Sequence, residues 1–277
     1  MSIAHGADGV GTLTPEALQA RLDEPGLLLL QITRPEVYEQ AHLPGAMLVT
    51  PPQLVGGVPP ATGRLPELAQ LTALFTAIGY TPEADIVLYD DEGGGWAGRM
   101  AWTLDVIGHR QWHYLDGGMH AWAAAGLPFA NGAFQPRDTP LAAALTVDRG
   151  PIAEIDDVLA AMDDPAEAIW DVRSAEEFAG LRQAAERAGH IPGAVNLDWL
   201  HLKDPATQRL TLTSTEALAA AGVPVAGRLI THCQTHHRSG LSYMLGRLLG
   251  LDIRAYHGSW SEWGNRYDTP IEAPLNP

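Results

Sequence analysis

The sequence predicts an α/β protein built from two similar halves, each with a mainly parallel β-sheet covered by helices on both faces. Short apolar runs of strand length alternate with segments of helical periodicity along the chain, and this alternation is typical of parallel sheets. The pentapeptide HLPGA at 42–46 returns as HIPGA at 190–194. A length of 277 residues is sufficient for about two domains of ordinary size.

The sequence around this pentapeptide is also repeated. LQITRPEVY at 30–38 matches WDVRSAEEF at 170–178, because both join an apolar run to a glutamate and then to an aromatic residue. LDGGMHAW at 115–122 matches YHGSWSEW at 256–263. Since three pairs of segments recur in the same order, we interpret the halves as copies of one fold.

In the first half, Thr14 followed by Pro15 and Glu16 is typical of a helix start. DIVLY at 85–89 has the composition of a buried strand and is the counterpart of RLITH at 228–232. Gly117 and Gly258 hold equivalent turn positions in the two halves. We expect a positive φ at both glycines.

In the second half, strands are expected at 169–172, 228–232 and 252–256. A helix between the last two is expected to begin near Ser239 and to end at Gly250. Its apolar residues recur at helical spacing: Leu241, Met244, Leu245, Leu248 and Leu249. Strands separated by helices imply a parallel sheet with right-handed crossovers.

The stretch at 127–150, LPFANGAFQPRDTPLAAALTVDRG, is rich in Pro, Gly and Asn. Such a composition is typical of a linker. We therefore predict a first domain at 1–130, an interdomain linker at 131–150 and a second domain at 151–277. We expect the two domains to pack against each other across a pseudo-two-fold axis.

Charge and hydropathy exclude several classes of function. With 33 acidic against 17 basic residues, the formal charge of −16 repels nucleic acids and anionic membranes. No apolar run approaches the roughly 18 residues that a membrane helix needs. Residues 1–18 have neither a basic start nor an apolar core, so no secretory signal is expected. We predict a cytoplasmic protein that binds neither nucleic acid nor membrane.

The chain has one cysteine, Cys233, which lies in THCQTHHRSG at 231–240. One thiol excludes an internal disulfide and a zinc site made of several thiolates, and it fits a reducing compartment. Three interpretations are open. The thiol could bind zinc with the neighbouring histidines, act as a reactive thiolate among anion-binding groups, or be an inert core residue.

The predicted strand, loop and helix around Cys233 favour the reactive thiolate. The carboxyl edge of a parallel strand is where open α/β sheets place their sites. A tight loop there turns backbone N–H groups inward as an anion cradle, and the helix N-terminus and Arg238 add positive charge. In such a loop the four side chains after the thiol point outward and cannot complete a tetrahedral zinc site. We therefore expect no metal.

Together these motifs resemble one known family. DVRSAEEF at 171–178, GHIPGAVN at 189–196, a cysteine loop at a helix start and YHGSWSEWG at 256–264 are similar to the tandem-domain rhodaneses, which are thiosulfate and mercaptopyruvate sulfurtransferases. The similarity covers nearly the whole chain. It implies two rhodanese-like domains, of which the first is catalytically inactive and the second carries the nucleophilic cysteine.

The first half carries YDDEGGGWAGRM at 89–100 in place of the cysteine loop. Asp90, Asp91 and Glu92 stand where the thiol would be, so this copy has no nucleophile and the wrong charge for an anion. No Lys-Ser or Lys-Thr follows GGG at 93–95, as a phosphate-binding loop requires. We interpret these glycines as a relic of the duplicated cradle.

The resemblance implies that Cys233 is the catalytic nucleophile of a ping-pong sulfurtransferase. Its thiolate would take the sulfane sulfur of thiosulfate as a persulfide and pass it to a thiophilic acceptor such as cyanide or a thiol, without a metal or organic cofactor. The predicted substrate-binding residues are Gln234, Thr235, His236, His237, Arg238, Ser239 and Arg173. Asp171 and Trp199 are predicted to support the site, although Asp171 could equally cap a helix and Trp199 could pack in the core.

The loop departs from the commonest family patterns. CQTHHRS is neither the CRKGVT of animal thiosulfate enzymes nor the CGSGVT of mercaptopyruvate enzymes, and it resembles the loop of the Azotobacter-type rhodaneses. The spacing Cys-x4-Arg is one residue shorter than in the related phosphatases and favours a cradle for a sulfur atom. Glu177 stands where the animal enzyme has a substrate-binding arginine. Three arginines are candidates to replace it: Arg173, Arg182 and Arg187.

Three other functions were considered. A mercaptopyruvate sulfurtransferase would need a small, hydroxyl-bearing loop, a phosphatase would need a longer one, and a persulfide carrier would hand its sulfur to a protein acceptor. We also expect activity to rise as His236 and His237 protonate, because only charged histidines attract a dianion.

Overall fold

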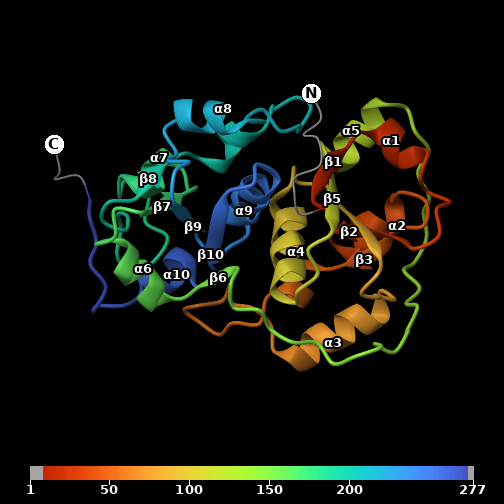
Figure 1. Ribbon diagram of the computed structural model, residues 1–277, viewed down its shortest axis with the longest axis horizontal. Coiled ribbons are helices and arrows are strands. Elements are labelled where there is room, and N and C mark those ends of the chain that lie inside the picture. The colour runs from red at the N-terminus through yellow and green to blue at the C-terminus, as the bar shows by residue number, and fades with distance from the viewer. Residues whose placement is uncertain (1–8, 274–277) are drawn as a thin grey trace.

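The computed structural model describes residues 9–273, in which the chain forms two five-stranded sheets (Figure 1). The strand order is β1-β5-β4-β2-β3 in the first sheet and β6-β10-β9-β7-β8 in the second, which is the same order in equivalent strands. All neighbouring strands pair in parallel. The predicted α/β fold with two similar halves is confirmed. The prediction about a secretory signal concerns a segment that lies partly outside the described residues.

Helices follow most strands in each half. The first half contains β1 (Gly11–Leu13), α1 (Pro15–Gln19), β2 (Leu27–Ile32), α2 (Pro35–Gln40), β3 (Met47–Val49), the 3-10 helix η1 (Pro51–Leu54), α3 (Leu68–Ala77), β4 (Asp85–Asp90), α4 (Gly95–Val106), β5 (Trp112–Leu115) and α5 (Gly118–Ala124). The second half contains β6 (Ile152–Ala153), α6 (Ile155–Ala161), β7 (Glu167–Asp171), α7 (Ala175–Phe178), β8 (Val195–Asn196), the 3-10 helix η2 (Trp199–Leu202), α8 (Thr215–Ala220), β9 (Arg228–His232), α9 (Arg238–Leu248), β10 (Asp252–Tyr256) and α10 (Ser259–Trp263).

Both faces of each sheet are buried. In β2, Leu28 and Leu30 belong to a core cluster shared by the two halves, whereas Leu29 belongs to a cluster on the opposite face. In β9, Leu229 and Ile230 divide in the same way between the shared cluster and a third cluster. Because successive side chains of a strand point to opposite faces, these short apolar strands need cover on both sides.

Helices α4 and α9 lie side by side between the two sheets and join the halves (Figure 1). Their backbones meet at two glycines. A Cβ added to Gly98 would lie 2.2 Å from the carbonyl oxygen of Gly240, and one added to Gly240 would lie 2.5 Å from the backbone nitrogen of Arg99. Only glycine permits this approach of two helix backbones.

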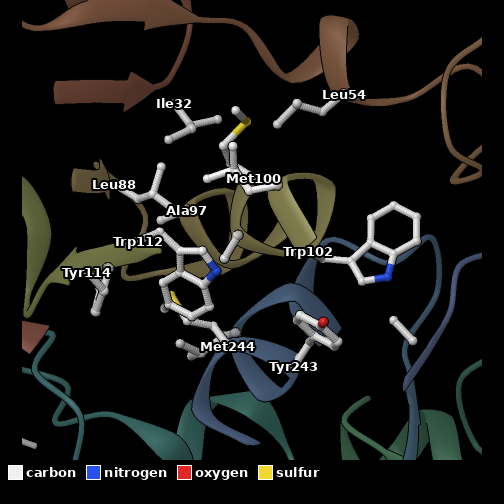
Figure 2. Packing of buried hydrophobic residues seen from close by; sticks show 14 of the residues in the cluster. Ile32, Leu54, Leu88, Ala97, Met100, Trp102, Trp112, Tyr114, Tyr243 and Met244 are labelled. Carbon is white, nitrogen blue, oxygen red and sulfur yellow. The ribbon is translucent and has the colours of Figure 1, made fainter. Parts of the chain in front are cut away.

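Side chains of the two helices share one core. Figure 2 shows Met100 of α4 in the same cluster as Tyr243 and Met244 of α9. Asp105 of α4 is buried and accepts hydrogen bonds from Tyr243 Oη at 2.7 Å and Arg247 Nε at 2.8 Å. The contact between the halves is therefore both apolar and hydrogen-bonded.

The repeated pentapeptide has the same structure in both halves. His42 Nδ1 lies 2.8 Å from the carbonyl oxygen of Tyr38, and His190 Nδ1 lies 2.8 Å from that of Phe178. Each imidazole also stacks on the same aromatic residue, with ring centroids 4.0 Å and 3.6 Å apart. These two histidines therefore fix a turn in each half.

The predicted helix limits agree with the structure to within two residues. Thr14 caps α1, and its hydroxyl accepts a hydrogen bond from the N–H of Ala17 at 3.2 Å. Helix α9 begins at Arg238, one residue before Ser239, and Gly250 follows its end with a φ of 72°.

The prediction of positive φ is confirmed for Gly117 and wrong for Gly258. Gly117 has a φ of 85°, but Gly258 has a φ of −66°, and the positive value of 54° occurs at Ser259. A different constraint explains the glycine. A Cβ at position 258 would lie 1.8 Å from a carboxylate oxygen of Glu262.

Residues 127–150 form no helix or strand apart from an isolated bridge at Ala130. The segment runs along the first half. Arg137 N donates to Ala77 O at 2.8 Å, and Asp148 N donates to Val106 O at 2.7 Å. These contacts fit the predicted linker, while the exact domain limits stay a prediction.

Candidate active site

Cys233 lies at the carboxyl end of the central strand of the second sheet. It follows β9 directly, and α9 begins at Arg238, so that residues 234–237 form the loop between them. The Cys233 residue is 1 % exposed. The thiol therefore sits at the edge of the sheet where the sequence places it, yet it is covered.

The loop is held from its outer side by the start of α10. The carbonyl oxygen of Cys233 accepts from Trp260 N at 3.0 Å, and that of Gln234 accepts from Ser261 N at 2.9 Å. Cys233 N donates to the hydroxyl of Ser259 at 3.4 Å. Because the C=O and N–H of a trans peptide point in opposite directions, carbonyls engaged outside leave the following N–H groups turned inward.

The surroundings of Cys233 favour its thiolate. Burial acts to raise the pKa of the thiol. The pKa is nevertheless lower than the ordinary value, because the charge of Arg238, the hydroxyl and N–H of Ser239 and the N–H of Thr235 outweigh burial. These groups form an anion cradle around the sulfur, and a thiolate is the nucleophilic form of cysteine.

Gln234 and Thr235 each have one polar group that contacts a neighbouring segment. Gln234 Nε2 donates to Ala184 O at 2.8 Å. The carbonyl oxygen of Thr235 faces the first half, where a Cβ on Gly63 would lie 2.2 Å from it. Of these two residues, Thr235 acts on the thiol through its backbone N–H, and contact of either residue with substrate stays a prediction.

His236 is fully buried at the contact between the halves. Its Nδ1 lies 2.8 Å from Ser239 Oγ, and its ring meets the ring of Trp102 edge-on at 4.7 Å. Burial, with the nearby charge of Arg99, lowers the pKa of His236 well below its ordinary value. A pKa this low opposes the expectation that His236 protonates to attract a dianion, because its imidazole stays neutral near pH 7.

His237 contacts aromatic and acidic groups of both halves. It stacks on Trp96 of the first half at 4.4 Å, and its Nε2 lies 3.2 Å from Glu92 Oε2. Trp199 lies 5.8 Å from the His237 ring, and Lys203 Nζ lies 4.1 Å above Trp199. The predicted supporting residue Trp199 therefore reaches the active loop through His237.

Arg238 is paired with Glu177 through two hydrogen bonds. Nη1 donates to Oε2 at 2.6 Å and Nη2 to Oε1 at 2.9 Å. Burial acts to raise the pKa of Glu177, but the ion pair lowers it to about 2. Arg238 is the charged group with the strongest effect on the thiol, and Glu177 partly neutralises it. Glu177 is also the residue that departs from the pattern of the animal enzymes.

Arg173 is engaged in a separate buried cluster. It is 1 % exposed, bonds to Asp171 with distances of 2.6 to 3.0 Å and donates to Gly189 O at 2.8 Å. Its guanidinium lies 4.2 Å above the Trp260 ring. Asp171 also lies 3.7 Å from His232 Nε2. The contact of Arg173 with substrate stays a prediction, and its visible role is to hold Asp171.

The other two candidate arginines, Arg187 and Arg182, lie in different surroundings. Arg187 donates to Thr269 O at 2.9 Å and to Trp263 O at 3.1 Å. Arg182 is exposed. Arg238 is therefore the arginine that most strongly affects Cys233.

The equivalent loop of the first half shows an occupied cradle. Asp90 ends β4 and is fully buried. Its carboxylate accepts from the N–H groups of Glu92 at 3.2 Å, Gly94 at 2.8 Å and Ala97 at 2.9 Å. A loop of this shape before a helix therefore holds an acidic group on its N–H groups, although burial raises the pKa of Asp90.

Within residues 9–273, no group of three or more His, Cys, Asp or Glu side chains is arranged to hold a metal ion. The two loop histidines, His236 and His237, face groups of the first half. Each imidazole packs against first-half aromatic residues, Trp102 and Trp96 respectively.

The duplicated parallel sheet and the covered thiol in an amide cradle define a two-domain α/β protein with one nucleophilic centre. The family model of the rhodanese-like domain matches residues 14–125 and again residues 154–266. The chain belongs to the rhodanese family.

Two relatives are similar over nearly their whole length. The chain is 44 % identical over 262 residues to proteins of Azotobacter vinelandii and Pseudomonas aeruginosa, both named thiosulfate sulfurtransferase. In each comparison the match covers 94 % of this chain and 96 % of the relative. The resemblance to the Azotobacter-type rhodaneses is confirmed.

Solved structures share the fold at lower identity. An anaerobic ergothioneine biosynthesis enzyme from Chlorobium limicola, in complex with trimethyl histidine, superposes with a TM-score of 0.82 at 19 % identity, over 96 % of this chain and 70 % of that one. The likeness at this identity concerns the fold alone. In the part of the chain that the structure describes, no helix is long and apolar enough to cross a membrane.

Sequence reasoning did not identify the first-half groups at this site. Gly63, Glu92, Trp96 and Arg99 all contact the loop 234–237 or its side chains. One signal was available for Arg99. It is a charged residue in the apolar stretch WAGRMAW at 96–102, where a solvated helix face is not expected.

Proposed function

We propose that the protein is a thiosulfate sulfurtransferase that works through a persulfide on Cys233. The observation that carries this proposal is a single thiol with a lowered pKa in an amide cradle, in a chain 44 % identical to named thiosulfate sulfurtransferases. The Cys233 thiolate attacks the outer sulfur of thiosulfate. The S–S bond of thiosulfate breaks, sulfite leaves with the electron pair, and the persulfide stays on Cys233.

The cradle stabilises charge through this step. The inward N–H groups, the Ser239 hydroxyl and Arg238 lie around the sulfur that bears negative charge before and after the transfer. The equivalent first-half loop supports this role, because there backbone N–H groups donate to the buried acidic group of Asp90.

The second half-reaction returns the enzyme to its starting state. A thiophilic acceptor such as cyanide or a small thiol attacks the outer persulfide sulfur, and the electron pair of the broken S–S bond returns to the Cys233 thiolate. Since Cys233 is 1 % exposed, we favour a small acceptor over a protein acceptor. The cycle uses no metal or organic cofactor.

We further propose that the protein works in the cytoplasm. A reactive thiol that is the only cysteine of the chain is preserved best in a reducing compartment. Localisation of the tagged full-length chain by fractionation tests this, and recovery in an extracytoplasmic fraction would oppose it.

Steady-state kinetics test the function. Thiocyanate release is measured over a matrix of thiosulfate and cyanide concentrations, with 3-mercaptopyruvate as a second donor and Cys233→Ser as the control. We expect parallel double-reciprocal lines for thiosulfate and no release from the variant. Faster turnover with 3-mercaptopyruvate than with thiosulfate would reassign the donor, and unchanged release from Cys233→Ser would remove Cys233 as the nucleophile.

A further inference from the structure

Arg99 of α4 is a buried cation that reaches from the first half to the active loop of the second. It is 0 % exposed, and its guanidinium donates to carbonyl oxygens only. Nη1 donates to Gly63 at 2.7 Å and, in a long contact of 3.5 Å, to His236, while Nη2 donates to Leu54 at 2.7 Å and to Arg64 at 3.2 Å.

No carboxylate within residues 9–273 pairs with this guanidinium, and its Nε has no hydrogen-bond partner. A buried cation without a counter-ion is costly. Burial lowers the pKa of Arg99 to about 9, and the negative charge that opposes this lowering is the thiolate of Cys233. Fold stability alone would be served as well by an apolar residue at this position.

The contacts of Arg99 lie directly behind the loop. Its acceptors at 54–64 belong to a segment that touches the loop, since a Cβ on Gly63 would lie 2.2 Å from Thr235 O and 2.9 Å from His257 O. His236 has a φ of 56°, which is unfavourable for a residue with a side chain. A donor that holds its carbonyl outward favours this conformation and turns the N–H of His237 to the opposite side.

The pseudo-symmetry of the chain allows the surroundings of the two loops to be compared. Gly98 and Gly240 meet at the helix crossing, so the residue equivalent to Arg99 is Leu241. Leu241 lies against Gly94 of the first-half loop, as Arg99 lies against His236. The first-half loop is already filled by the Asp90 carboxylate. A cation also contacts the first-half loop, since Lys203 Nζ donates to Glu92 O at 2.7 Å, and its negative partners there are Asp90 and Glu92. Behind the second-half loop, the negative group that acts on Arg99 is the Cys233 thiolate.

We propose that Arg99 is a positioning residue of the Cys233 site, which holds the loop 234–237 in its anion-binding conformation and places a positive charge behind it. The first half therefore completes the second-half cradle. This inference rests on the proposed function, because it explains how a thiolate and then a persulfide are stabilised at Cys233.

Other charged or titratable groups also face this region. Arg238 has the largest attractive effect on the thiolate, and Glu177 partly neutralises it. The remaining groups are Arg173 with His232 and Asp171, Arg64 and Glu154 with His257, Glu92 with His237, and His236. All of them are retained when Arg99 is changed, so a shift in the thiol titration reports Arg99.

The test is a pH titration of thiolate absorbance in Arg99→Met and Arg99→Lys. Cys233 is the only cysteine, so each variant is compared with the same variant carrying Cys233→Ala, and the difference reports one thiol. We expect Arg99→Met to raise the thiol pKa by about half a unit or more, and Arg99→Lys to restore at least half of the shift. The matched control Leu241→Met should leave the midpoint unchanged.

A folded Arg99→Met protein with the wild-type midpoint would overturn the proposal, and so would an equal shift in Leu241→Met. If Arg99→Met does not fold, Gly63→Ala decides, because it displaces the segment from Thr235 and keeps Arg99. A raised midpoint then supports the proposal, and an unchanged one opposes it. The titration needs no thiosulfate, so failure of sulfur uptake by the wild-type protein would count against the proposed function alone.

Discussion

Glu177 limits the positive charge that Arg238 offers to a substrate. Both ends of the Arg238 fork bond to this carboxylate, whose pKa is lowered to about 2, so the pair is fully charged at neutral pH. A thiosulfate dianion therefore approaches an arginine that is already neutralised. The ion pair therefore weakens binding of the anion but fixes the orientation of the guanidinium.

Glu177→Gln should lower KM for thiosulfate roughly three- to tenfold, which corresponds to about 0.7 to 1.4 kcal/mol. Glutamine keeps the cap of α7, since its side-chain oxygen can still accept from Ser174 N. Steady-state kinetics at constant ionic strength measure the effect. Glu176→Gln removes the same charge from an exposed position of the same helix and should change KM little. An unchanged KM in Glu177→Gln would contradict this account, and a raised KM would show that the pair is needed to bind the donor.

The pH profile of sulfur uptake should follow the Cys233 thiol. The reactive form is the thiolate, so kcat/KM for thiosulfate should rise with pH through a midpoint below the ordinary value of a thiol. Arg238→Gln in the Glu177→Gln background should raise this midpoint by about half a unit or more, because the main attractive charge is lost. Arg182→Gln, an exposed arginine, is the control. A midpoint that does not move on loss of Arg238 would contradict the assignment.

At the scale of elements, the crossing of α4 and α9 decides where the cradle lies. The start of α9 carries Arg238 and Ser239, and the helix is fixed two residues later in contact with Gly98. Because backbone meets backbone, neither helix can shift to make room for a side chain. The positions of the loop residues relative to the first half therefore depend on two glycines.

Gly240→Ala should destabilise the protein by about 1 to 3 kcal/mol through overpacking. At this chain length that corresponds to a fall in Tm of roughly 2 to 4 °C per kcal/mol. Gly246→Ala in the same helix is the matched control, since its Cβ would meet the Ile253 side chain rather than backbone. Thermal unfolding followed by circular dichroism compares the two. Equal falls in Tm would mean that the close approach of the two helix backbones does not increase the cost of an added side chain.

The elements also show what a sequence can predict here. The strand at 228–232, the helix after it and the duplicated order follow from local periodicity and repetition, and all are present. The Glu177–Arg238 pair joins residues far apart in the chain, and the role of Arg99 depends on how two helices cross. Neither leaves a local pattern. At Gly258 the repeat predicted the wrong backbone conformation, because the residue with a positive φ is Ser259 rather than Gly258.

At the scale of the molecule, ion pairs between the halves should make the protein sensitive to acid. Arg64 of the first half pairs with Glu154 at 3.2 Å and with Glu262 at 2.7 Å in the second. The His257 imidazole, whose Nε2 lies 3.5 Å from Glu154 Oε1, outweighs burial and, with the charge of Arg64, lowers the pKa of Glu154 to about 2. The ionised carboxylate therefore stabilises the folded state at neutral pH.

This contribution should be present above the unfolded pKa of about 4.3 and lost as the pH falls toward 2, since the folded pKa is the lower one. Denaturant unfolding between pH 5 and pH 2 measures it. The free energy of unfolding should fall less steeply with pH in Glu154→Gln than in the wild type, whereas Glu39→Gln, at an exposed position, should behave as the wild type. Parallel curves for wild type and Glu154→Gln would exclude this pair as a source of acid sensitivity.

The most direct test of sulfur transfer at Cys233 is the intact mass of the protein after incubation with thiosulfate. The wild type and Cys233→Ala are weighed before and after addition of cyanide. We expect the wild type to gain one sulfur atom and to lose it to cyanide with release of thiocyanate, and the variant to gain none. A wild-type protein that takes up no sulfur, or a Cys233→Ala protein that does, would contradict a persulfide on Cys233.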